Sequence, residues 1–351
     1  MQAGNAQYSK CLGYSSLEPG NQRPMRPGSV FKIASASKLI ATIAVLQAVE
    51  RGLIGLDDDV EAYIPELTSQ AVLTGFTWYG KPIVQPRRKT ITVAHLLTQT
   101  AGTGYDFLNI HPLWRYRWWH RQAIAGGDTV EERYAYPLLH EPGDGWTYGS
   151  GLSWAGRIVE RVSGRSLEDW VREHIREPLG LSSVTFFPHD NPDVAARLVS
   201  TSYRSSWTGK VQYCPELDRP ESSTECLGGE GVYASMEDML AILRSLLVDD
   251  EKLLGKKTTA MMFRPQLTEV QRCMMRKCLE LPRWICETIL KKDEYDWGTG
   301  GVLIDGDGHE CLQKGTLMWS GLFHNLWVRD RTFLFFSGSL LGSLPWRMPI
   351  Y

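Results

Sequence analysis

Hydrophobic residues near the start of the chain change from an alternating to a helical spacing. Residues 29–33 alternate in the way that is typical of a short strand. From Ser35 onward, Leu39, Ile43 and Leu46 recur on one stripe of a helix. Gly52 follows where a helix commonly ends, because glycine tolerates the left-handed backbone of a C-terminal cap. The pattern predicts a short strand followed by a helix over about 35–51.

The rest of the chain shows strand patterns toward its ends and helical patterns between them. A short helix ended by Pro65 is expected. The part at about 90–224 is expected to be mainly helical and loop-rich, and it includes a helical segment at 93–97 and an amphipathic one at 152–162. Ser235 has an acidic residue three places on, which predicts an N-cap and a helix to about 247. Strands are predicted at 315–322 and 332–336.

This order of elements predicts an α+β fold with two domains. An α/β sandwich, in which helices flank an antiparallel sheet, is expected to form from residues 1–88 and 225–351. A mainly helical domain is expected to be inserted at 89–224.

Two serines near the start of the chain have a lysine three places on, and only one pair can meet. Ser29 and Lys32 fall in the predicted strand, which sends them to opposite faces. Ser35 and Lys38 fall on one face of the first helical turn. Serine is a poor nucleophile near pH 7, and a lysine can activate it only if its pKa falls from about 10.4 to near 7. The alternative is a plain N-cap serine beside a solvated lysine.

Composition narrows the possible functions. The chain has 351 residues, 43% of them hydrophobic, and a formal net charge of −2, which gives no electrostatic basis for nucleic-acid binding. Its seven cysteines are odd in number and lack zinc-binding spacing, so reduced thiols in the cytoplasm are expected. We expect no cofactor or metal, no signal peptide and no membrane span, because no ligand spacing, phosphate loop, leader pattern or long apolar run occurs.

Two further segments carry groups that acyl transfer needs. Tyr148 lies on a glycine-rich turn just before a predicted helix, where a phenol can relay protons. The predicted strand at 315–322 ends in small residues and is able to aim a backbone N–H at an oxyanion. Taken singly, the tyrosine is more often a packing aromatic and the strand an ordinary one.

Taken in order, these segments resemble the serine β-lactamase and penicillin-binding-protein superfamily, whose motifs are S-x-x-K, Y-x-N and K-T-G. The resemblance is nearest to the class C branch and, within it, to fungal lovastatin-type transesterases. It extends over nearly the whole chain and runs through residues 33–39, 46–53, 96–102, 146–149, 154–156 and 228–232.

The resemblance implies a β-lactamase/transpeptidase-like fold and a set of site residues. Ser35 is the expected nucleophile, and Lys38 and Tyr148 are the expected base and proton relay, in an order that the sequence leaves open. The backbone N–H groups of Ser35 and Leu322 are expected to form the oxyanion hole. The expected substrate-binding residues are Ser150, Trp319, Ser320 and Gly321.

Departures from the family motifs bear on the substrate. Trp319 replaces the third-motif lysine that pairs with a substrate carboxylate, so β-lactam and peptidoglycan substrates are not expected. Ser150 replaces the Y-x-N asparagine, and Gln99 replaces a usual histidine as a structural substitution. The chain is also expected to lack a helix and a strand that precede the matched part in relatives, and a helix that follows it.

The resemblance therefore implies a serine acyltransferase that moves an acyl group from a thioester donor, free or on a carrier protein, to a secondary-metabolite alcohol. Two alternatives remain open: a hydrolase of the same family that uses water, and a non-catalytic scaffold or truncated homologue. The segment 114–121 interleaves aromatic and basic residues and is expected to form a helix or lid at the pocket mouth, with its arginines outward.

Overall fold

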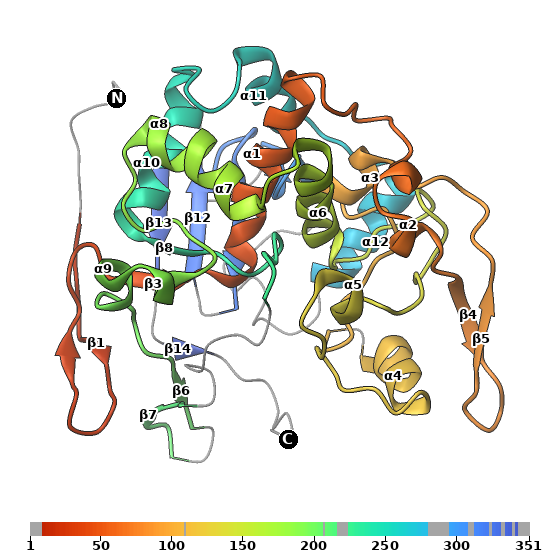
Figure 1. Cartoon of the computed structure of the whole chain (residues 1–351), viewed down its shortest axis with the longest axis horizontal. Helices are drawn as coiled ribbons and strands as arrows, with labels where there is room; N and C mark the ends of the chain where they lie inside the picture. Colours follow the sequence, from red (N-terminus) through yellow and green to blue (C-terminus); the bar gives the residue numbers. More distant parts are fainter. Residues whose placement is uncertain are drawn as a thin grey trace.

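The computed structural model describes residues 9–108, 110–205, 208–215, 224–279, 295–307, 312–322, 325–330, 334–338 and 341–342. Its largest sheet is antiparallel, in the order β13-β12-β11-β10-β9. The strands are β9 (Tyr295–Trp297), β10 (Val302–Ile304), β11 (Leu317–Gly321), β12 (Asn325–Arg329) and β13 (Leu334–Ser337). Helix α10 (Met236–Val248) packs against β12 and β13, as Figure 1 shows. This mixture of helices with an antiparallel sheet confirms the predicted α+β class.

Four smaller sheets surround the helices. Three are two-stranded and antiparallel: β1 (Tyr14–Ser16) with β2 (Arg23–Pro24), β3 (Val30–Lys32) with β8 (Tyr233–Ser235), and β4 (Val72–Phe76) with β5 (Pro82–Gln85). In the fourth, β6 (Ser202–Arg204) pairs with β7 (Val211–Tyr213) and with β14 (Leu341–Gly342). The part expected to be mainly helical thus contributes the strands β6 and β7, and β6 pairs with β14 from near the C-terminus. The division into two domains stays a prediction.

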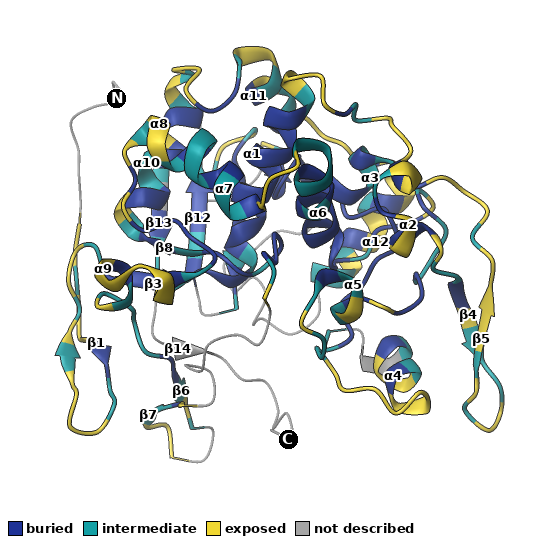
Figure 2. Cartoon of the chain, in the orientation of Figure 1, coloured by how far each residue is buried: buried dark blue, intermediate teal, exposed yellow. Residues whose placement is uncertain are grey.

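The central helix is α1 (Ser37–Glu50), preceded by a 3₁₀ turn at Ala34–Ala36. Helix α1 begins two residues later than predicted, because Ser35 belongs to the turn. All residues from 37 to 48 are buried, so α1 is enclosed on all sides rather than along one stripe, and Figure 2 shows its dark blue course through the middle. Gly52 has φ +69° just after the helix, which confirms the predicted cap.

The remaining helices are short or lie around α1. They are α2 (Pro65–Thr68), α3 (Val93–Leu97), α4 (Arg115–Trp119), α5 (Val130–Arg133), α6 (Gly151–Ser163), α7 (Leu167–Val171), α8 (Glu177–Leu179), α9 (Pro192–Ala195), α11 (Lys256–Met262) and α12 (Glu269–Leu279).

Several local predictions are confirmed. Helices α3 and α6 occupy the predicted segments, and Ser235 Oγ accepts the Asp238 N–H at 3.2 Å to cap α10. Strand β11 lies in the predicted segment, and β13 covers the part of 332–336 that falls in the described residues. A short 3₁₀ helix at Val60–Ala62 ends before Pro65, as predicted, and Pro65 itself begins α2, because its fixed φ and missing N–H suit the first helical position.

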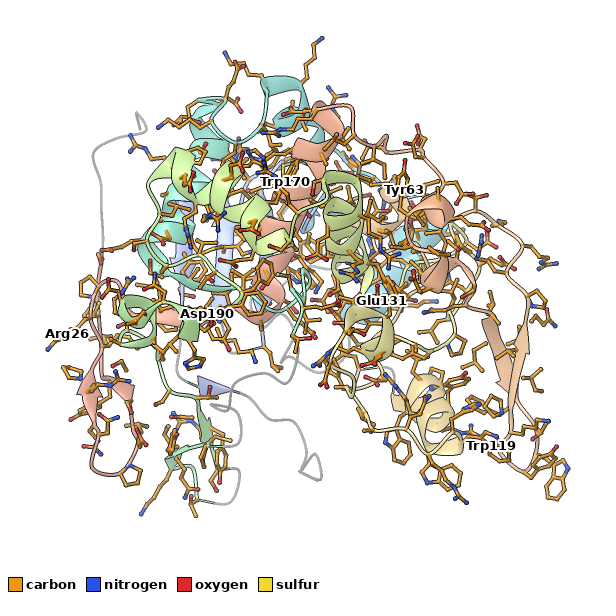
Figure 3. All side chains as sticks on the ribbon, viewed as in Figure 1. Arg26, Tyr63, Trp119, Glu131, Trp170 and Asp190 are labelled. Atoms are coloured by element: carbon orange, nitrogen blue, oxygen red, sulfur yellow. The ribbon has the colours of Figure 1, made fainter. Side chains whose placement is uncertain are left out.

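Helix α6 packs along α1 and is tied to α5 and α2 by ion pairs. Arg161 contacts Glu66 at 2.8 Å and Glu131 at 2.7 Å, and Arg157 contacts Glu131 at 2.9 Å. Glu131 is labelled on α5 in Figure 3, beside the lower end of α6. This network fixes the side of α6 that faces away from α1.

The described residues contain no helix long and apolar enough to cross a membrane and no group of three or more His, Cys, Asp or Glu side chains placed to hold a metal ion. Cys11, Cys226, Cys273 and Cys278 are free thiols, and Cys214 is also described. The two other cysteines lie outside the described residues.

Candidate active site

Ser35 lies on the tight turn that joins β3 to α1. Ala34, just before it, has φ +44°, a left-handed conformation that a residue with a Cβ seldom adopts. Gly321 at the end of β11 lies against this turn, since a Cβ at Gly321 would come within 2.2 Å of the Ile33 carbonyl oxygen. The turn and the end of β11 are therefore packed together, and this places Ser35 beside Ser320, Gly321 and Leu322.

Lys38 lies one turn further along and is completely buried. Its Nζ donates to the Gly229 carbonyl at 2.8 Å and to Tyr105 Oη at 3.1 Å, and it lies 4.7 Å from the centroid of the Tyr148 ring. Burial lowers the pKa of Lys38 to about 7, although the negative charge of Glu230 acts in the opposite direction. A lysine with this pKa is partly neutral near pH 7, which is the condition for its use as a base.

Tyr148 lies on the loop before α6, and that loop is held tightly. A Cβ at Gly149 would come within 2.2 Å of the Thr103 carbonyl oxygen, so only glycine fits there. Gln99 accepts the Gly149 N–H at 2.9 Å with its side chain and the Thr147 N–H at 3.0 Å with its carbonyl. This supports the structural role expected for Gln99. Trp319 Nε1 donates to Tyr148 Oη at 3.1 Å from the other side.

A pocket that is partly open to solvent lies over these residues. The described residues that line it are Ala34, Ser35, Tyr105, Phe107, Leu108, Tyr148, Glu230, Ser320, Gly321 and Leu322. Its wall is mainly apolar and aromatic, which is typical of a site for an apolar small molecule.

The structure brings most of the predicted site residues to this pocket, and two lie behind it. Ser35, Tyr148, Ser320, Gly321 and Leu322 line the wall, and Lys38 lies beneath Tyr105 and Tyr148. The other two, Ser150 and Trp319, are buried and are not among the described lining residues. Trp319 donates a hydrogen bond to Tyr148 Oη and so supports a residue of the pocket wall from behind.

Sequence reasoning missed five of the described lining residues: Ala34, Tyr105, Phe107, Leu108 and Glu230. Tyr105 follows the 96–102 segment by three residues, and Glu230 lies inside the 228–232 run. Both neighbourhoods carry the family resemblance, so proximity to those segments was the available signal. It did not distinguish a pocket residue from a packing residue.

The prediction for 114–121 is partly wrong. A helix does form there, as α4, but Arg117 points inward and is 3% exposed, with Nε 2.9 Å from Asp106 Oδ2. Trp118 is instead 66% exposed. An inward Arg117 is stable because Asp106 neutralises it, and Asp106 is the neighbour of Tyr105 in the pocket wall.

The fold and this pocket are those of the β-lactamase/transpeptidase-like class of proteins, with Ser35 at the pocket wall and Lys38 buried behind it. The Beta-lactamase family matches residues 1–284, and the chain belongs to that family. Monacolin J acid methylbutanoyltransferase from Aspergillus terreus is 33% identical, covering 99% of this chain and 86% of its own length. Lovastatin esterase from Penicillium rubens is 35% identical and covers 93% of this chain and 83% of its own length.

Among solved structures, a variant of simvastatin synthase from Aspergillus terreus superposes with a TM-score of 0.86. It is 33% identical, and the match covers 97% of this chain and 83% of that structure. These findings confirm the predicted fold and resemblance. The chain is an enzyme, and acyl transfer is its function.

Proposed function

We propose that Ser35 carries an acyl group from a thioester donor to the hydroxyl of a small-molecule alcohol. The observation that carries this proposal is the buried Lys38, whose pKa of about 7 leaves it partly neutral beside a pocket that contains Ser35 and Tyr148. A structural lysine would normally remain charged and exposed.

In the first half-reaction, Ser35 Oγ attacks the thioester carbonyl while its proton passes to Lys38, directly or through Tyr148. The backbone N–H groups of Ser35 and Leu322 stabilise the oxyanion, and such donors contribute about 2.7–4 kcal/mol each in the transition state. The C–S bond then breaks, and the thiol leaves with the proton. An acyl ester on Ser35 remains.

In the second half-reaction, the acceptor hydroxyl attacks this ester and gives its proton to the same base. The bond between the acyl carbon and Ser35 Oγ breaks, Oγ recovers the proton, and the product ester leaves. Proton transfers balance over the cycle, so no cofactor is required.

Relatives suggest the classes of donor and acceptor. One relative is named as a methylbutanoyl transferase to monacolin J acid, so a short branched acyl group and a polyketide-type alcohol are the first candidates. The apolar wall formed by Phe107, Leu108 and Leu322 suits such molecules. We propose a donor thioester that is either free or bound to a carrier protein. We also propose a cytoplasmic location, which free thiols at Cys11, Cys226, Cys273 and Cys278 support.

Mass spectrometry after incubation with an α-methylbutyryl thioester tests the proposal. We expect an adduct of one acyl group on the peptide that contains Ser35, and none in Ser35→Ala. The variant should retain the wild-type circular dichroism spectrum and melting temperature. A folded wild-type protein that forms no adduct with this thioester or with a p-nitrophenyl ester would contradict the proposal.

A hydrolase is the second candidate because a relative is named lovastatin esterase. Both reactions share the acyl-enzyme and differ in whether water or alcohol reaches it. Product analysis over increasing alcohol concentration separates them. A rising share of ester indicates a transferase, whereas free acid in constant yield indicates an esterase.

A further inference from the structure

Five large aromatic side chains are exposed where the β4–β5 hairpin meets α4. They are Trp78, Tyr79, Trp114, Trp118 and Trp119. The centroid of the Tyr79 ring lies 5.3 Å from that of Trp78 and 6.2 Å from that of Trp119, so the hairpin and α4 form one surface. Figure 3 labels Trp119 at this edge of the molecule. Single exposed aromatics are common in proteins, whereas a cluster of them marks an interaction site.

The packing beneath these rings holds them outward. Arg117 of α4 is buried and pairs with buried Asp106 at 2.9 Å, which fixes one side of the helix against the body. The neighbouring Trp118 lies on another side of α4 and is exposed. The guanidinium carbon of Arg115 lies 4.0 Å from the ring centroid of Phe76 in β4, and this contact ties α4 to the hairpin. The exposure of the rings therefore belongs to the folded structure.

The segments that carry these rings are rich in positive charge. Residues 67–127 contain seven lysines and arginines and a single acidic residue, Asp106, which pairs with Arg117. Three of the cations pair with acidic residues from other segments; they are Arg87, Arg88 and Lys89. Three more are exposed and have no ion-pair partner among the described residues; they are Lys81, Arg115 and Arg121. With the five aromatic side chains these three form what we call the hairpin–helix patch, which is positive in a chain of net charge −2.

An anionic lipid surface has the chemistry that this patch fits. Indole and phenol rings settle at the level of the lipid headgroups, and each lysine or arginine near an anionic surface increases affinity about fivefold. Figure 1 shows that the hairpin and α4 project from one edge of the body, so both can reach a flat surface. A nucleic acid could also stack on the rings, but it requires a basic groove that follows its backbone, and three unpaired cations do not make one.

We propose that the hairpin–helix patch binds the protein to the surface of anionic membranes, with its aromatic rings among the lipid headgroups. The cytoplasmic leaflet of cell membranes is anionic, which agrees with the location proposed above. Binding there keeps the pocket close to apolar esters and acyl donors, which collect in lipid. The inference concerns location and does not depend on the Ser35 mechanism, because membrane binding is measured without substrate.

Vesicle flotation of the full chain tests the inference. The vesicles contain phosphatidylcholine alone, or phosphatidylcholine with about 30% phosphatidylserine to give an anionic surface. We expect wild type to float with the anionic vesicles at about 0.1 M salt and to be released at about 1 M salt, where charges are screened over a few ångströms. Neutral vesicles should bind about 100-fold more weakly, because three cations then lose their partners. Wild type that fails to float with anionic vesicles, or that binds both kinds equally, overturns the inference.

A pair of double variants tests the cations. Lys81→Gln with Arg121→Gln should weaken binding to the anionic vesicles about 30-fold. Lys252→Gln with Lys257→Gln is the matched control, because it removes two exposed lysines on or just before α11, which lies far from the patch in Figure 1. The control should bind as wild type does. Equal losses in both double variants would show that overall charge drives binding, and they would overturn the role of the patch.

A second pair of double variants tests the rings. Trp78→Ser with Trp118→Ser should weaken binding about tenfold or more, because each indole withdraws apolar area from water. Leu12→Ser with Tyr14→Ser is the control, since it removes two exposed apolar side chains at β1 and should leave binding unchanged. Each variant should keep the wild-type circular dichroism spectrum and melting temperature. If anionic vesicles fail to bind wild type but polyglutamate or a single-stranded oligonucleotide does, the patch serves an acidic protein or a nucleic acid, and the membrane assignment is wrong.

Discussion

Replacement of Lys38 by methionine should change how the free energy of unfolding depends on pH. Burial lowers the pKa of Lys38 from 10.5 to about 7 in the folded protein. Between these two values the unfolded chain binds a proton that the folded protein has lost, so wild-type stability rises with pH in this window. Below about pH 7 both states hold the proton, and the cost of burying the charge is fully present.

The expected magnitude follows from the width of the window. Each pH unit above the folded pKa adds about 1.4 kcal/mol to the free energy of unfolding. From pH 6 to pH 9 the free energy of unfolding of wild type should therefore rise by about 2–3 kcal/mol relative to that of Lys38→Met. Methionine cannot donate the hydrogen bonds to Gly229 and Tyr105, so the variant lacks them at every pH. Tyr105 itself stays protonated over this range, because burial raises its pKa well above 10.0. Their contribution therefore cancels when the difference at one pH is compared with that at another.

Urea unfolding followed by tryptophan fluorescence at pH 6, 7, 8 and 9 measures this difference. Lys256→Met is the matched control, because the Lys256 side chain is 68% exposed. The free energy of unfolding of this variant should follow that of wild type across the pH range. If the free energies of unfolding of wild type and Lys38→Met change in parallel from pH 6 to pH 9, Lys38 keeps an ordinary pKa in the folded protein. It then cannot act as the base near neutral pH, and the mechanism proposed for Ser35 fails.

Two further substitutions test how the pocket is supported. Trp319→Phe removes the donor to Tyr148 Oη, and a net hydrogen bond of about 0.5–1.5 kcal/mol predicts a fall in acylation rate of up to about tenfold. Trp297→Phe is the control: it also loses a buried indole hydrogen bond, but one to a backbone carbonyl, and its acylation rate should stay near that of wild type. An equal fall in acylation rate in both variants would contradict a role for Trp319 in positioning Tyr148. Arg117→Met leaves Asp106 buried without its ion-pair partner and should lower the free energy of unfolding in urea by about 3–5 kcal/mol. The added change Asp106→Leu should recover most of that loss, and no recovery would show that packing rather than charge was lost.

Features set by neighbouring residues were predictable from the chain alone. The strand-to-helix change that leads to α1, the cap at Gly52 and the cap at Ser235 depend on residue preferences within a few positions. The motif residues Ser35 and Tyr148 were identified in the same way, from local patterns that occur together in a fixed order. Their roles in the chemistry stay a prediction.

Long-range contacts decided the rest. The pKa of Lys38 falls because α1 is enclosed on all sides, and no local pattern reveals how deeply a helix is buried. Arg117 turns inward because Asp106 meets it across a loop, although its own segment resembles an exposed basic face.

The sequence by itself determined the α+β class, the family resemblance and a nucleophile candidate, because these depend on residue type and spacing along the chain. Only the tertiary structure decided that Tyr105 and Glu230 share a pocket with Ser35. It also decided that Trp319 is buried behind the pocket wall, where it donates to Tyr148. These residues lie tens to hundreds of positions apart, and burial, dielectric environment and hydrogen-bond geometry exist only once folding has brought them together.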